Sequence, residues 1–195
     1  MARPKDRPNE RKSLPMNAQH SKLLRLVFAA LLAALCYVAT LIIQVPTPTN
    51  GYVNLGDCIV LLSGWMLGPV WGFFAAGIGS MLADVLSGYA YYAPATFLIK
   101  GVMALLGAVL YRLIFKAFRH SLPAFLLSAL VGEIIMVLGY FGYAALILGR
   151  GLGAAASIPG NVVQGVFGLV ISTVLALLLS KTPLMNRVKV QTSAN

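Results

Sequence analysis

Six apolar segments, separated by polar turns, occupy most of this chain and limit what it can fold into. We place them at residues 22–45, 57–67, 69–87, 94–116, 122–148 and 156–180. Crossing the hydrocarbon core of a bilayer takes about 20 apolar residues of helix, so the second segment should be tilted, partly re-entrant or shielded by its neighbours. The chain is 59% hydrophobic and 10% charged, far outside the usage of soluble proteins. We therefore predict an all-α polytopic membrane protein, a six-transmembrane-helix bundle with a short second helix.

The sequence also predicts how the chain is divided. Residues 1–20 are expected to form a disordered basic tail, residues 21–181 the six-helix transmembrane domain, and residues 182–195 a second basic tail. The polar stretch before the first apolar segment is too long for a signal peptide and no small-residue cleavage site follows it, so we expect a retained helix. Gly68 and Pro69 should separate the second and third helices, because proline disfavours helical geometry in the residue before it.

Basic residues predict the orientation of the bundle. Lys and Arg total 15 against 5 Asp and Glu, and beside apolar spans such an excess marks the cytoplasmic face of a membrane and not a nucleic-acid partner. With six spans, all but Lys100 and Arg150 fall on one side: Arg3, Lys5, Arg7, Arg11, Lys12, Lys22, Arg25, Arg112, Lys116, Arg119, Lys181, Arg187 and Lys189. We predict a multi-pass membrane protein with both termini cytoplasmic, and with the connections at 46–57, 87–96 and 149–157 facing outward.

Polar and aromatic residues concentrate in these outer connections and suggest a site that opens outward. The candidates in the loops are Tyr52, Asn54, Tyr89, Tyr91 and Tyr92. Tyrosines at headgroup depth are also typical of an interfacial aromatic belt, which is the better explanation for any single one of them. A belt does not explain the polar residues set a turn or more into other helices from the same side, which are Lys100, Asn161 and Gln164.

Ionisable residues inside the apolar segments are the most informative. A charge at mid-span costs roughly 2.5–3.5 kcal/mol on insertion scales, so Asp84, Lys100 and Glu133 should face partners, water or ligand. Asp84 and Lys100 lie at comparable depth across a short connection, and we expect a structural ion pair between them. Glu133 has no basic residue at its level, so it is protonated, bonded to a neighbouring helix, or lining the bottom of a cavity. Asp57 is expected to cap the second helix.

The chain carries no pattern that predicts catalysis. It has no GxxxxGK[ST] phosphate loop, so it is not expected to hydrolyse ATP itself. Neither His20 nor His120 lies in an apolar segment near acidic residues or cysteines, so a metal site or a nucleophilic triad has no basis. We therefore predict neither an enzyme nor a resident cofactor or metal.

One part of the sequence resembles a known family. The run GYVNLGDCIVLLSGWMLGPVWGFFAAGIGSMLADVLSGYAYYAPATFLIKG, residues 51–101, follows an Ala-rich first segment and Pro46-Thr47-Pro48. Together they resemble the substrate-binding S components of energy-coupling factor (ECF) transporters, closest to the branch associated with pyridoxine and hydroxymethylpyrimidine. The resemblance covers the first four helices by motif, and the last two by length, topology and small-residue content.

The resemblance implies a multi-pass subunit of the bacterial plasma membrane that captures a small vitamin or precursor from outside for ATP-driven uptake. Its implied partners are a transmembrane coupling subunit and two cytoplasmic ATPases. In this family an AxxxA motif of the first helix contacts the coupling subunit, and Ala29 with Ala33 or Ala30 with Ala34 match it. The implied ligand-binding residues are Tyr52, Asn54, Tyr89, Tyr91, Tyr92, Lys100, Glu133, Asn161 and Gln164, with the first outer loop as a lid.

Other interpretations remain open from the sequence. Asp84, Lys100 and Glu133 could serve as a proton relay in a self-sufficient secondary transporter, although no convincing inverted repeat supports it. A structural membrane protein without a ligand is the second alternative. Within the S-component interpretation, a neutral ring bonded to Asn and Gln side chains favours a pyridine or pyrimidine, whereas a carboxylate on Lys100 favours pantothenate or a similar acid.

Overall fold

The computed structural model describes residues 16–46 and 52–182, so residues 1–15, 47–51 and 183–195 of the predicted tails and first outer loop lie outside it. The elements in chain order are α1 (Met16–Ile42), β1 (Gln44–Pro46), β2 (Tyr52–Asn54), α2 (Asp57–Leu67), α3 (Pro69–Leu86), α4 (Ala93–Phe118), α5 (Ser121–Gly142), the π-helical η1 (Tyr143–Ile147), the 3₁₀ segment η2 (Gly151–Ser157) and α6 (Ile158–Ser180). Five helical stretches are long and apolar enough to cross a membrane, and α2 is the shorter apolar helix. The predicted all-α bundle is confirmed.

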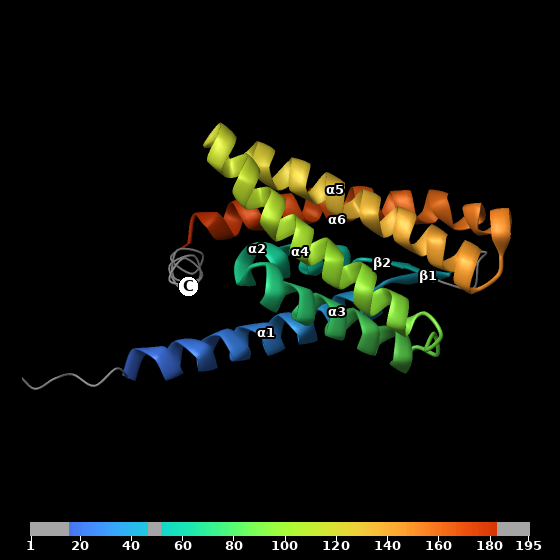
Figure 1. Ribbon diagram of the computed structural model, residues 1–195, viewed down its shortest axis with the longest axis horizontal. Helices are drawn as coiled ribbons and strands as arrows, with labels where there is room; N and C mark the ends of the chain where they lie inside the picture. Colours follow the sequence, from blue (N-terminus) through green and yellow to red (C-terminus); the bar gives the residue numbers. More distant parts are fainter. Residues whose placement is uncertain (1–15, 47–51, 183–195) are drawn as a thin grey trace, which may run out of the picture.

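The helices place the polar connections at two opposite ends of the bundle. The start of α1, the turn between α4 and α5 and the end of α6 lie at one end, which we call the basic end (Figure 1). It carries Lys22, Arg25, Arg112, Lys116, Arg119 and Lys181. The β1–β2 hairpin, the turn between α3 and α4 and the η1–η2 connection lie at the other, the hairpin end. This arrangement agrees with the predicted topology, and the assignment of the basic end to the cytoplasm stays a prediction.

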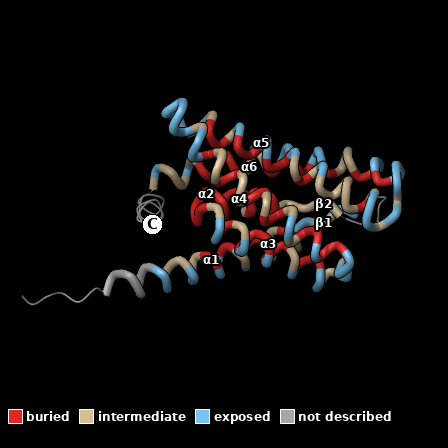
Figure 2. The backbone as a smooth tube through the Cα atoms, in the orientation of Figure 1, coloured by how far each residue is buried: buried red, intermediate tan, exposed pale blue. Residues whose placement is uncertain are grey.

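Helix α2 is enclosed by the rest of the bundle. Every residue of it except Ile59 is buried, and it contacts α1, α3, α4 and α6 (Figure 2). At 11 residues and 1.5 Å per residue it is about 16 Å long, roughly half the thickness of the hydrocarbon core. Of the arrangements expected for so short a helix, shielding by neighbours is the one found. Gly68, with φ 84°, and Pro69 at the first turn of α3 end α2 as predicted.

Two features differ from the sequence prediction, the start of the first helix and the structure of the first outer connection. Helix α1 begins at Met16, so the part of the predicted disordered tail from 16 to 20 is helical. Hydropathy marks only the apolar part of a helix, whereas intrinsic helix propensity continues it into polar sequence. The first outer connection contains a short antiparallel hairpin that pairs Gln44 with Asn54 and Pro46 with Tyr52, which the sequence analysis did not predict. Three-residue strands are too short to show an alternating pattern.

Glycines allow the helices to approach one another closely. A Cβ atom on Gly64 of α2 would lie 2.1 Å from the backbone oxygen of Ala104 in α4. On Gly79 of α3 it would lie 2.2 Å from the backbone oxygen of Ala33 in α1. Small residues drive helix association in lipid by permitting this contact. The position of α2 in the interior therefore depends on the absence of a side chain at Gly64.

We predict that Gly64→Ala lowers the thermal stability of the protein in detergent, because a methyl group there must push α2 away from α4. Overpacking of this kind costs about 1–3 kcal/mol. Gly142→Ala is the matched control, since a Cβ at that helical position meets nothing within 4 Å. The measurement is the fraction of monodisperse protein that survives heating. Equal melting of the two variants would show that the α2–α4 contact is not limiting.

Candidate functional site

A buried ion pair lies in the interior of the bundle. The ammonium group of Lys100 on α4 contacts the Oδ1 atom of Asp57 in the first turn of α2. The two side chains are only 2% and 1% exposed. Charges so far from water persist only when they are paired and further hydrogen-bonded. Lys100 lies closer to the start of α4 (Ala93) than to its end (Phe118), so the pair is inside the bundle but nearer the hairpin end than the basic end.

Gln164 of α6 completes the hydrogen bonding of the pair and links it to the hairpin. Its Nε2 donates to the Oδ2 atom of Asp57 at 2.7 Å, and its Oε1 accepts from the backbone N–H of Asn54 at 2.7 Å. The side chain of Asn54 accepts from the backbone N–H of Gly56 at 2.8 Å, which fixes the turn into α2. One continuous network therefore connects α4, α2, α6 and β2. We call Asp57, Lys100 and Gln164 the central triad.

Two predictions about the charged residues are wrong. Asp57 does not cap α2: Gly56 occupies the cap position, no side chain caps it, and the Asp57 carboxylate bonds to Lys100 and Gln164. The expected pair of Asp84 with Lys100 does not form, since Asp84 instead accepts a hydrogen bond from the Tyr52 hydroxyl at 2.6 Å. Counting residues from helix ends gives depth along the bundle but not the direction in which a side chain points, and Lys100 points to α2.

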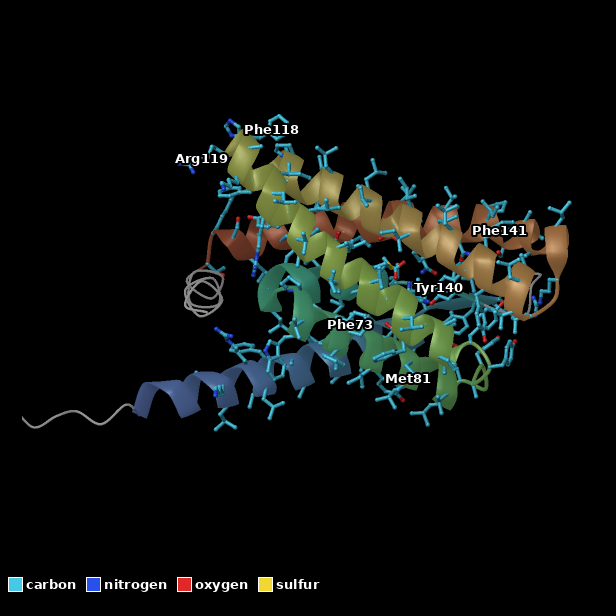
Figure 3. All side chains as sticks on the ribbon, viewed as in Figure 1. Phe73, Met81, Phe118, Arg119, Tyr140 and Phe141 are labelled. Atoms are coloured by element: carbon cyan, nitrogen blue, oxygen red, sulfur yellow. The ribbon has the colours of Figure 1, made fainter. Side chains whose placement is uncertain are left out.

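A second polar layer lies between the central triad and the hairpin. The Thr96 and Tyr140 hydroxyls are hydrogen-bonded at 3.0 Å, and the Lys100 ammonium lies 5.4 Å from the centre of the Tyr140 ring, within range of a cation–π interaction. Tyr140 lies on the side of α5 that faces α3 and α4, whereas Phe141 lies on the other side (Figure 3). The sequence analysis missed Thr96 and Tyr140. Their signal is helical spacing, since Thr96 precedes Lys100 by one turn and Tyr140 follows Glu133 by two.

The predicted tyrosines contact one another at the hairpin end. Ring centres are 4.8 Å apart for Tyr52 and Tyr89, 5.0 Å for Tyr91 and Tyr92, and 5.6 Å for Tyr92 and Tyr143. Burial, together with the neighbouring Asp84 carboxylate, raises the pKa of the Tyr52 hydroxyl, which therefore remains a donor at neutral pH. The contacts join the hairpin to the α3–α4 turn and to η1. Contacts between aromatic rings add packing energy, which an interfacial position alone does not provide.

Glu133 and Asn161 lie in the interior on α5 and α6. Glu133 is 5% exposed, and its two carboxyl oxygens make no hydrogen bond within the described part of the chain. It faces Gly165 and Gly168, where a Cβ atom on Gly168 would lie 2.3 Å from its Oε1 atom and 2.8 Å from the Cβ of Asp57. Asn161 is 6% exposed and precedes Gln164 by one turn on the same helix.

An apolar groove of about 240 Å³ separates α5 from α6 beside Glu133. Its lining residues are Leu130, Glu133, Ile134, Val137, Leu138, Val162, Gly165, Val166 and Leu169. Several of these side chains are exposed on the outer face of the bundle, Leu138 by 62% and Val166 by 57%. In a bilayer such a face contacts lipid, so we do not assign the groove to a water-soluble ligand.

The structure therefore divides the predicted site residues into two groups. Asn54, Lys100, Glu133 and Gln164 lie in or beside the central triad, and Asn161 is buried one turn before Gln164 on α6. Tyr52, Tyr89, Tyr91 and Tyr92 lie above them at the hairpin end, with Tyr52 linked to Asp84. The arrangement offers buried hydrogen-bonding groups beneath aromatic rings, which suits the binding of a small flat molecule.

We predict strong energetic coupling between Lys100 and Asp57 and little between Lys100 and Asp84. Lys100→Met alone leaves Asp57 unpaired and should cost about 3–5 kcal/mol of unfolding free energy. The double change with Asp57→Asn should recover at least about 1 kcal/mol of that loss, whereas the double change with Asp84→Asn should be additive within about 0.5 kcal/mol. Unfolding by SDS titration in mixed micelles measures both cycles. Coupling to Asp84 in place of Asp57 would contradict the pairing.

Comparisons with known proteins give one consistent family. A family model described as "ECF-type riboflavin transporter, S component" matches residues 20–181. The chain is 37% identical over 145 residues to an uncharacterized protein in the gap 3′ region of Pyrococcus woesei, covering 74% of this chain and 93% of that protein. It is 27% identical over 164 residues to the thiamine precursor transporter HmpT of Lactococcus lactis subsp. cremoris, covering 83% and 91%.

A solved structure shares the fold. It is titled "Structure and mechanism of the S component of a bacterial ECF transporter", and it matches 82% of this chain and 96% of its own with a TM-score of 0.61 and 21% sequence identity. The arrangement of five long helices around a short, enclosed one is therefore not peculiar to this sequence.

Proposed function

This chain belongs to the family of ECF-type riboflavin transporter S components, and we propose that it captures a small vitamin or vitamin precursor at the outer side of a bacterial plasma membrane. Partner subunits, a transmembrane coupling protein and two cytoplasmic ATPases, would then drive uptake. The family is one of transporter substrate-binding subunits and not of enzymes. This favours the S-component interpretation over a self-sufficient secondary transporter and over a structural protein without a ligand.

The observation that carries the proposal is the direct bond from the outer hairpin to the central triad. The backbone N–H of Asn54 bonds to Gln164, which bonds to Asp57. A structural protein has no need to bury three polar side chains at the inner end of an outer loop, where desolvation is costly. A binding subunit does, because a ligand held there must be recognised and then enclosed by the same loop.

The charge pairing favours a nitrogen heteroaromatic ligand over an acid. Lys100 is the group that would bind the carboxylate of pantothenate, but it is already neutralised by Asp57. Gln164, Thr96 and Tyr140 instead offer neutral donors and acceptors beneath aromatic rings. The similarity to a thiamine precursor transporter supports the same choice. We propose a substrate of the pyridoxine or hydroxymethylpyrimidine type, with pantothenate as the less favoured possibility.

The first test is to identify what the protein carries. The full chain is purified in detergent and denatured, and small molecules released in near-stoichiometric amount are identified by mass spectrometry. We expect a pyrimidine or pyridine compound. If nothing is released and the protein also fails to bind a panel of water-soluble vitamins, the proposed function is wrong.

The structure separates the two predicted alanine pairs on α1. Ala29 is 8% exposed, and the backbone of Ala33 packs against Gly79 of α3, so this pair lies within the bundle. Ala30 and Ala34 are exposed on the opposite face, in the middle of the apolar part of α1. We propose that Ala30 and Ala34 form the surface that receives the coupling subunit, because small exposed side chains let a partner helix approach closely in lipid.

Replacing both exposed alanines by tryptophan, Ala30→Trp with Ala34→Trp, should reduce ATP-driven uptake to background while leaving ligand affinity within about threefold of the unchanged protein. Bulk on this face blocks a partner but does not touch the site. The matched control is Leu127→Trp with Val131→Trp, an exposed pair at the same spacing on α5. Uptake in reconstituted vesicles and ligand titration in detergent are the measurements. Equal loss of uptake in both pairs would remove the assignment of this face.

A further inference from the structure

The interior of the bundle holds more acidic groups than basic ones. The chain has 5 Asp and Glu residues, and three of them, Asp57, Asp84 and Glu133, have side chains that are at most 5% exposed. Within residues 22–46 and 52–182, Lys100 is the one basic residue with a buried side chain. Buried charges in a membrane protein require compensation. Two carboxyl groups therefore lack a cationic partner from the described chain.

These acidic groups differ in how their oxygens are used. Both oxygens of Asp57 accept hydrogen bonds, one from Lys100 and one from Gln164. Asp84 accepts from the Tyr52 hydroxyl. Glu133 alone of the three has two oxygens that accept nothing from the described residues. An acceptor left without a donor in the interior costs free energy, about 1–3 kcal/mol and more for a charged group.

Glu133 lies beside the central triad. It is close to Asp57, since both side chains approach the position of a Cβ on Gly168. Between Glu133 and the hairpin end, α5 places Met136, whose sulfur lies 3.9 Å from Nε2 of Gln164. Met136 is fully buried, but an unbranched side chain with three rotatable bonds can move aside for an inserted ring. Met136 is thus an adaptable apolar side chain in contact with the central triad, one turn of α5 from Glu133.

We infer that Glu133 is a specificity-determining residue that accepts N–H donors from the substrate, which is therefore an amino-substituted nitrogen heteroaromatic and not an acid. A carboxyl group with two free oxygens suits the adjacent ring nitrogen and exocyclic amine of an aminopyrimidine, which present parallel donors when the ring is protonated. This inference rests on the proposed function and narrows it. A pyridine that lacks an amino group would leave one oxygen of Glu133 unsatisfied.

The test compares two ligands that differ in one group. Calorimetric titration of the full chain in detergent uses 4-amino-5-hydroxymethyl-2-methylpyrimidine and its 4-oxo analogue, in which oxygen replaces the amino group. The unchanged protein should prefer the amino compound. Glu133→Gln should weaken binding of the amino compound by about 10- to 100-fold and change that of the 4-oxo compound by less than about threefold.

A stability measurement separates recognition from a structural role. Glu133→Gln removes an acidic group without a partner, so the unfolding midpoint of the unliganded protein should not fall. Ser128→Ala is the matched control on the same helix: Ser128 accepts from Trp65 and donates to Ala124, so its loss should lower the midpoint and leave the ligand preference unchanged.

Three results would overturn the inference while leaving the S-component proposal intact. They are equal weakening of both pyrimidines by Glu133→Gln, a fall in the unliganded midpoint without a change of preference, and tight binding of pantothenate or riboflavin that Glu133→Gln does not affect. Failure of every vitamin to bind, with no released small molecule, would instead refute the proposed function itself.

Discussion

The ion pair between Lys100 and Asp57 is the interaction on which the interior arrangement depends. A charged pair can persist inside a membrane protein only if every side of it is covered and its remaining atoms are hydrogen-bonded. Helix α2 satisfies the first condition because it starts within the bundle and is surrounded by four helices. Gln164 satisfies the second. Burial of the pair thus requires the start of α2 and Gln164 of α6 to lie at the same depth in the bundle.

Close backbone contact makes that enclosure possible. Gly64 lies against Ala104, and a Cβ on Gly72 of α3 would fall 2.7 Å from the Cα of Gly64. Three helices therefore meet with almost no side chains between them. In lipid, where hydrophobicity does not favour helix association over lipid contact, such packing is the principal attraction. Glycine is common in membrane helices, but here Gly64 and Gly72 allow the close approach that positions α2 and its buried Asp57.

The sequence was informative about elements and less so about their contacts. Apolar runs and the Gly68-Pro69 break predicted the helices and the topology, because hydropathy and proline geometry act locally. Apart from Thr96 and Tyr140, the polar residues of the interior network were also foreseen, since polar side chains in apolar helices are few. The contacts between these residues were not foreseen. Asp84 and Lys100 lie at similar depth, but Asp84 accepts a hydrogen bond from Tyr52 of the hairpin, and Lys100 pairs with Asp57 of α2. Such choices depend on helix rotation, which a single sequence does not encode in any local pattern.

Helix α1 offers a physical connection between the ligand site and the proposed coupling surface. Its Thr40 packs against the turn that leads into α2, because a Cβ on Gly56 would lie 2.2 Å from the Thr40 hydroxyl oxygen. Gly56 is bonded to Asn54, which is bonded to Gln164. Ten residues earlier on the same helix, Ala30 is exposed. Coupling between two sites requires an element whose position both of them affect. A ligand that shifted Asn54 would act on the end of α1 through these contacts, and a rigid helix would carry that displacement to the face that we propose for the partner.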